Sequence, residues 1–205
     1  MAIHRDVLRG SILEGQTFNR FGYVNGDPVS LIDPFGLSAI SSCTDNVINT
    51  RANDAGLDLS PKPSPYKQLG HKTKKKLEAK VDNRTITKEE YKRLEWNKRL
   101  AARRDVGVKE FWQQEKLRIK KGEPTTRNWS QQQRDDILSN KVPTHNGKTI
   151  TGHHAYSVSK YPHLANQGEI IYPATVKEHF NRWHGGSYRK GLPGKPYNPS
   201  FPEEF

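Results

Sequence analysis

The stretch TGHHAYSVSKYPHLANQGEIIYPATVKEHFNRWHGG (151–186) decides the fold of this chain, and it holds five of the eight histidines among 205 residues. Two of them, His153 and His154, are adjacent, and two more, His179 and His184, lie just before a Gly-Gly pair. Neutral imidazole is a common ligand of Zn²⁺, Ni²⁺ and similar ions. The clustering therefore raises the question of whether the chain folds so that these side chains meet around one ion.

A short helix and a hairpin are predicted before the histidine pair. Ser130 and Gln133 have the spacing of a capping box, which opens a helix. The Asn-Gly pair at 146–147 is a two-residue turn signal, so His153 and His154 are expected at the end of the second hairpin strand. Because neighbouring side chains on a strand point in opposite directions, one imidazole can face an ion while the other faces a substrate.

A strand and a second short helix are predicted after the pair. Residues 170–172 have the apolar character of a strand, which Pro173 is expected to break. The sequence TVKE (175–178) is a further capping box, so a helix starts there and carries His179 and His184 toward the Gly-Gly pair. Residues five apart on an ideal α-helix point about 140° away from each other. The helix must therefore loosen near its end if both imidazoles bind one ion.

Such a set of histidines suits phosphodiester hydrolysis. Three imidazoles hold a metal ion and leave an open coordination position. The ion can stabilise charge on the leaving oxygen and lower the pKa of a bound water. A fourth imidazole that is not bound to the ion can act as a general base. Arg182 and Arg189 flank the histidines and are candidates for binding phosphate.

The charge of the chain favours a polyanionic partner. The net charge is +12, and residues 1–37 contribute −1 (three Arg against four Asp or Glu), so residues 38–205 carry +13. Such a charge attracts nucleic acid, although a solvated basic surface has the same composition. The single cysteine excludes an intrachain disulfide and a Cys-based zinc finger. No apolar run reaches the length of a membrane span, and no signal peptide opens the chain.

The middle of the chain is expected to be helical and strongly basic over residues 71–122. Thr87 and Glu90 form a capping box, and Gly122 is a plausible stop. Twelve Lys and Arg lie between residues 88 and 121. They either face solvent or a protein partner, or hold phosphates of DNA directly.

An eleven-residue motif, DPVSLIDPFGL (27–37), marks the front of the chain. It closely resembles the junction N-P-V-x-x-x-D-P-x-G-L at the end of the Rhs repeat-associated core of bacterial polymorphic toxins, with Asp27 in place of the usual Asn. The resemblance implies a large β-rich shell around a C-terminal toxin that is released by self-cleavage after Leu37. It also implies that Asp33 is one catalytic aspartate of this cleavage and that Asp6 is the candidate for the second.

The segment 128–189 resembles the HNH nuclease superfamily with the ββα-metal fold, in the GHH-signature toxin branch found at the C-termini of Rhs toxins. Carried over by position, the resemblance implies that His153 is a metal ligand and His154 the general base. It implies that His179 and His184 are the remaining metal ligands.

Two features depart from the family pattern. The family's middle Asn stands nine residues before the first helix histidine, and this chain has Ile170 there. Asn166 is the nearest candidate for orienting His154 and is retained as a possible catalytic residue. The helix ligands of the family stand four residues apart, whereas His179 and His184 stand five apart.

Together these observations predict an α+β fold, with a ββα-metal (HNH) core, a basic helical extension and, before them, the end of a β-rich Rhs core. The expected organisation is the end of the core with its cleavage junction (1–37), a linker and basic helical segment (38–127), the nuclease domain (128–190) and a Pro-rich tail (191–205).

The expected function is a metal-dependent DNA endonuclease that acts as an antibacterial toxin, with one divalent ion (Zn²⁺, Ni²⁺ or Mg²⁺). The expected partners are DNA, an acidic immunity protein, and the Rhs shell and secretion machinery of the parent effector, for example a type VI system. Such a toxin is secreted without a signal peptide and acts in the cytoplasm of the target cell. The alternatives are an RNase on the same scaffold, a non-catalytic module with a structural zinc ion, and a degenerate toxin remnant.

Overall fold

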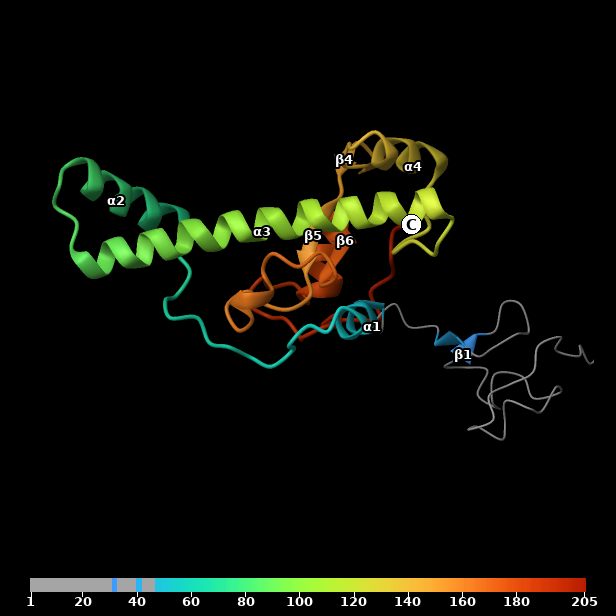
Figure 1. Ribbon diagram of the computed structural model, residues 1–205, viewed down its shortest axis with the longest axis horizontal. Coiled ribbons are helices and arrows are strands. Elements are labelled where there is room, and N and C mark those ends of the chain that lie inside the picture. Colours follow the sequence, from blue (N-terminus) through green and yellow to red (C-terminus); the bar gives the residue numbers. More distant parts are fainter. Residues whose placement is uncertain (1–30, 33–39, 42–46) are drawn as a thin grey trace, which may run out of the picture. The chain divides into compact units, whose positions relative to one another are not determined.

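The computed structural model describes residues 31–32, 40–41 and 47–205 (Figure 1). The chain divides into two units, Met1–Asn46 and Val47–Phe205. In the first unit, strands β1 (Leu31–Ile32) and β2 (Ile40–Ser41) pair antiparallel. Asp6, Asp33 and Leu37 lie outside the described residues, so the self-cleavage junction stays a prediction.

The second unit has the predicted α+β composition, in which helices surround small antiparallel strand pairs (Figure 1). Its elements are α1 (Val47–Asp54), α2 (His71–Asp82), α3 (Lys88–Lys121), α4 (Gln131–Leu138), β3 (Thr144–His145), β4 (Lys148–Thr149), β5 (Thr151–His154), the 3₁₀ turn η3 (Pro162–Leu164), β6 (Ile171–Ala174), α5 (Val176–Glu178) and the π-helical turn η4 (His179–Trp183). None of the described helices is long and apolar enough to cross a membrane. The predicted domain boundaries at 37, 127 and 190 stay predictions.

Helix α3 is the longest element, with 34 residues. The Thr87–Glu90 capping box forms at its start, and Gly122 ends it in the left-handed conformation at φ 70°, both as predicted. Acidic residues in its first turn and basic residues in its last turn complement the helix dipole. By a rise of 1.5 Å per residue the helix is about 51 Å long, so one element connects α2 at one end with α4 at the other (Figure 1).

One face of α3 packs closely on the strands and loops of the core. Gly107 lies so near the backbone of Ala165 that a Cβ at this position would come within 2.6 Å of the Ala165 carbonyl oxygen. One residue further along α3, Val108 lies against Gly152 of β5. Phe111 is fully buried on the same face. The close approach fixes the strand and the loop that flank the histidines relative to α3.

The hairpin and the strands are paired differently from the sequence prediction. The Asn-Gly turn joins β3 to β4, but this hairpin has only two residues on each side. Ile150 then enters the core, only 2% exposed, and the chain continues into β5, which pairs antiparallel with β6. The histidine pair therefore lies on β5, outside the hairpin. Burial of Ile150 is the physical reason, since it redirects the chain toward a new partner.

Pro173 does not break the strand, contrary to the prediction. It lies within β6, opposite Gly152 of β5. A proline lacks only the backbone N–H, and both strands of a two-stranded sheet are edge strands, so β6 tolerates the loss. Its carbonyl oxygen instead accepts a hydrogen bond from Arg127 at 3.1 Å.

The Pro-rich tail folds back onto the core. The backbone carbonyls of Pro199 and Phe201 accept hydrogen bonds from Arg182. Glu203 accepts a hydrogen bond from Tyr172 at 2.7 Å, and the ring of Phe205 lies under the guanidinium of Arg127, 3.8 Å from its carbon. The tail is thus a structural part of the unit.

Candidate metal centre

His153 comes from the buried face of β5. Its cross-strand neighbour is Tyr172, and both rings pack against Trp183, with centroid distances of 4.6 and 4.8 Å. The side chain is 6% exposed. Since side chains alternate along a strand, His154 points to the other face of β5.

His179 and His184 come from one turn that is not α-helical. The TVKE capping box forms as predicted and starts α5. After three α-helical residues the chain widens into the π-helical turn η4, and His184 is the C-cap residue directly after it. A π-helix connects residues i and i+5, so it turns a five-residue spacing into a same-side pair. The predicted loosening of the helix therefore takes this specific form.

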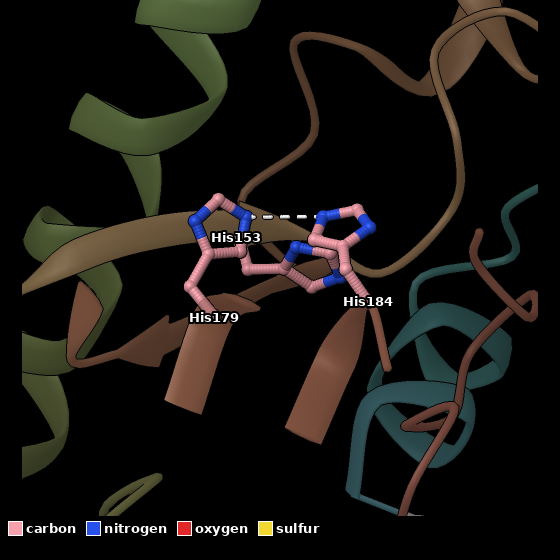
Figure 2. Close-up of side chains that lie close together, drawn as sticks. All are labelled: His153, His179 and His184. Carbon is pink, nitrogen blue, oxygen red and sulfur yellow. Dashed lines mark hydrogen bonds between the residues drawn. The ribbon is translucent and has the colours of Figure 1, made fainter. Parts of the chain in front are cut away.

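The three imidazoles meet (Figure 2). One ring nitrogen from each of His153, His179 and His184 lies within 4.8 Å of the others, and the Nε2 atoms of His179 and His184 are 3.3 Å apart. Two nitrogens that bind a tetrahedral ion at about 2.1 Å are separated by roughly 3.4 Å, so this pair is already at ligand spacing. In the described part of the chain, no carboxylate or carbonyl oxygen accepts a hydrogen bond from the facing Nε2 atoms of His179 and His184.

The surroundings of the three residues suit metal ligation further. The Nδ1 atom of His184 lies 2.6 Å from the carbonyl oxygen of Lys190, which makes Nδ1 the donor and leaves the Nε2 lone pair for the site. Burial, followed by the charges of the neighbouring histidines, holds the pKa of His153 well below its usual range. Burial and His184 lower the pKa of His179 to about 4. Both imidazoles are neutral near pH 7, the state that a metal ion requires.

His154 lies apart from the three and is held by the backbone. Its Nε2 is 3.0 Å from the carbonyl oxygen of Ala165, so Nε2 carries the proton and Nδ1 is the basic nitrogen. Burial lowers the pKa of His154 to about 4, although the hydrogen bond to Ala165 acts in the opposite direction. The imidazole is therefore neutral and oriented, as a general base must be.

The other predicted site residues lie elsewhere. The Oδ1 atom of Asn166 accepts a hydrogen bond from Arg103 at 2.7 Å, and the neighbouring carbonyl of Ala165, not Asn166, orients His154. Arg182 is buried, 8% exposed, and donates to the tail carbonyls, so its guanidinium has a structural place away from solvent. Arg189 is exposed beside the site, and its phosphate-binding role stays a prediction.

A buried ion pair supports the turn that carries the helix histidines. Glu178, the capping-box glutamate directly before His179, receives two hydrogen bonds of 2.9 Å from the two terminal nitrogens of Arg127. Both side chains are 1% exposed. Burial raises the pKa of Glu178, but the hydrogen bonds from Arg127 and from the backbone of Glu204 outweigh it and the pKa falls below its usual value. The pair is thus fully charged and rigid.

Arg104 was not among the residues that the sequence singled out. Arg104 precedes Gly107 by three residues and Val108 by four, so it lies on the same face of α3 as these two residues, which pack against Ala165 and β5. The side chain of Arg104 is itself exposed. Its positive charge contributes, after burial, to the lowered pKa of His153, His154 and His179. In the sequence it is one of twelve basic residues on a helix, and only the packing of α3 distinguishes it.

Comparison with known families agrees with this geometry. Residues 94–175 match a family described as "GHH signature containing HNH/Endo VII superfamily nuclease toxin". The match starts inside α3 and extends through β6, so it includes Arg104, Gly152, His153 and His154. The match ends at Thr175, before His179 and His184. The fold brings these two histidines next to His153. No curated protein matches this chain.

Proposed function

We propose that this chain, a nuclease by its match over residues 94–175 to the GHH-signature HNH/Endo VII nuclease toxin family, is a metal-dependent DNA endonuclease. His153, His179 and His184 hold one divalent ion, and His154 is the general base. The observation that carries the proposal is the meeting of three neutral imidazoles beside a fourth that the backbone orients.

The residues divide the chemistry between them. When bound, a divalent ion stabilises the negative charge that develops on the phosphate and the leaving oxygen. The Nδ1 atom of His154 takes the proton from the attacking water, while the proton on Nε2 stays there and is donated in a hydrogen bond to the carbonyl oxygen of Ala165. Arg104, an exposed guanidinium whose charge acts on His153, His154 and His179, binds a phosphate oxygen. The water oxygen forms a bond to phosphorus, the bond to the leaving oxygen breaks, and solvent protonates that oxygen.

One feature permits DNA as the substrate, and a second favours catalysis over a structural metal site. Attack by water needs no 2′-hydroxyl group, so the arrangement cleaves DNA without help from the sugar. A structural zinc site is closed by four protein ligands. Among the described residues, no fourth His, Cys, Asp or Glu joins the three histidines, which supports an open position for substrate.

The biological role follows from the family and the front motif. We propose that the nuclease is the C-terminal toxin of an Rhs effector, released after Leu37 and delivered into the cytoplasm of a target cell. A producing cell then needs an immunity protein. The charge of +13 on residues 38–205 supports an acidic protein that covers the site or the basic face of α3.

The proposal is tested by incubating residues 38–205, as wild type and as His154→Ala, with plasmid DNA and with total RNA. Each reaction contains Mg²⁺, Zn²⁺ or Ni²⁺, or EDTA. We expect metal-dependent DNA cleavage that falls by about 10²- to 10⁴-fold in His154→Ala, while metal binding is retained. Cleavage of RNA alone would favour the RNase, and bound metal without any cleavage would favour the structural zinc module.

A further inference from the structure

A groove lies next to the turn that carries His179 and is lined by its neighbours Phe180 and Asn181. Its cavity has a volume of about 470 Å³, within the range of ordinary ligand sites. The hairpin β3–β4, the first turn of α5, and the segment after the Gly-Gly pair form its walls. The residues that matter for its chemistry are Lys148, Lys177, Phe180 and Tyr188.

Tyr188 connects this groove to the histidines. Its ring centroid is 5.6 Å from that of His179 and 5.2 Å from that of His184, and it also contacts Phe180 at 5.1 Å. The contacts with His179 and His184 are edge-to-face. The side chain is nevertheless 60% exposed. A tyrosine that packs against three neighbouring rings and is still open to solvent can serve as a platform on which another ring stacks.

Two lysines line the groove, and in the part of the chain that the structure describes only Lys148 has a charge that no carboxylate compensates. Lys177 is 3.5 Å from the carboxylate of Glu204, so its charge is partly compensated. Lys148 is exposed on β4, and among the described residues no carboxylate lies within ion-pair distance of it. The groove therefore combines an aromatic platform beside the histidines with an available cation further out.

We propose that this groove binds the nucleotide adjacent to the scissile phosphate, with its base stacked on Tyr188 and the next phosphate on Lys148. This inference rests on the proposed nuclease function and adds a substrate class to it. A base can reach Tyr188 only when it is unpaired, because a duplex covers both faces of each base. Aromatic platforms combined with cations are the means by which proteins bind single strands without sequence preference. The preferred substrate is therefore a single-stranded or locally opened nucleic acid.

The test measures binding without cleavage. Fluorescence anisotropy in EDTA follows a labelled 12-nucleotide single strand bound to the wild-type chain, Tyr188→Ala, Tyr188→Phe and Tyr91→Ala. Tyr91 is the matched control, because it is 47% exposed but lies thirteen residues before Arg104 on α3. We expect Tyr188→Ala to bind about 5- to 150-fold more weakly, the range found for one base–aromatic stack. Tyr188→Phe should restore binding and Tyr91→Ala should leave it unchanged.

An abasic strand identifies the contact. Removing the bases should weaken binding to the wild type, and Tyr188→Ala should then cause no further loss. Equal binding of the intact strand by the wild type and Tyr188→Ala would overturn the groove assignment, as would failure of Tyr188→Phe to restore binding. Lys148→Ala should lower the slope of log affinity against log salt by roughly 0.7 relative to Lys75→Ala on α2, which removes the same charge.

Cleavage assays separate the two proposals. If the wild type cleaves a single strand faster than the same sequence in a duplex and Tyr188→Ala loses that preference, the groove has the assigned role. If the wild type cleaves nucleic acid but Tyr188→Ala binds and cleaves like it, only the groove assignment fails. If the wild type neither binds nor cleaves any strand, the proposed nuclease substrate fails with it.

Discussion

Arg127 and Glu178 form a buried, two-point ion pair directly before the first helix histidine. The glutamate is at the same time the last residue of the TVKE capping box and the acceptor for the backbone N–H of Glu204. One carboxylate thus connects the segment after α3, the start of α5 and the tail. The orientation of His179 depends on this connection, because the two residues are adjacent in one turn.

Arg127→Ala should destabilise the chain by about 3–5 kcal/mol, because it leaves the charge of Glu178 buried and unpaired. Urea unfolding followed by circular dichroism measures the change. Arg189→Ala, at an exposed position, should alter the stability by less than about 0.5 kcal/mol. A midpoint for Arg127→Ala equal to that of the wild type would contradict the role of the pair.

Gly107→Ala should also destabilise the chain, although alanine is normally the better helix former. A glycine in the middle of a helix costs about 0.5–1 kcal/mol relative to alanine, so an open site would gain that amount. Here a Cβ would come within 2.6 Å of the Ala165 carbonyl, which holds His154. Ala102→Gly, at an exposed position of α3, calibrates the helix preference. A gain in stability for Gly107→Ala would mean that the loop moves away freely.

His179→Ala should weaken the binding of Zn²⁺ or Ni²⁺ at least about tenfold. Removing a residue that only hydrogen-bonds to a metal ligand already lowers metal affinity about 10- to 100-fold, and His179→Ala removes a ligand itself. Isothermal titration should give one site per chain for the wild type. His71→Ala, at an exposed position of α2, is the control. In the same experiments, EDTA should lower the melting temperature of the metal-loaded wild type but not that of His179→Ala. An unchanged affinity in His179→Ala would remove this residue from the ligand set.

The stability of the metal-free chain should fall as the pH decreases from about 6.5 to about 4. The pKa of His154 and of His179 lies near 4 in the folded state and near 6.5 when unfolded. In this window the unfolded chain binds more protons, so each group lowers the free energy of unfolding by up to about 1.4 kcal/mol per pH unit. Urea midpoints at pH 7.5, 6 and 5 in EDTA measure the slope. His154→Gln should reduce this slope and His71→Ala should not.

Arg104→Ala should lower kcat/KM by about 10- to 150-fold, as expected for the loss of one charged hydrogen bond of about 1.5–3 kcal/mol. Arg99→Ala removes the same charge from α3 but about 140° around the helix, and should have little effect. Steady-state cleavage of a fluorescent oligonucleotide provides both values. Equal losses in the two variants would mean that the total charge of α3, and not the position of Arg104, matters.

Local signals allowed much of the fold to be predicted. The capping boxes at Thr87, Ser130 and Thr175 and the stop at Gly122 all form. They depend on hydrogen bonds between residues that are close in sequence, so the pattern contains the necessary information. The sequence also predicted that His153, His179 and His184 lie together, because the residue type restricts the chemistry strongly.

Long-range features could not be predicted in this way. The pairing of β5 with β6 depends on where Ile150 is buried, and the tail contacts of Glu203 depend on the positions of Arg127 and Tyr172. The orientation of His154 by a backbone carbonyl carries no residue signal, so Asn166 was the nearest visible candidate. Arg182 has the charge of a phosphate ligand, but only the fold shows that its guanidinium faces the tail.

The tail contacts also determine when the enzyme can mature during synthesis. Glu203, Glu204 and Phe205 complete the surroundings of Arg127 and Glu178, but they follow His184 by about 20 residues. At a translation rate of about 5–20 residues per second, they are added about 1–4 s after His184. The growing chain therefore passes through a stage in which the histidines of the candidate site have been synthesised but the tail residues that surround Arg127 and Glu178 have not.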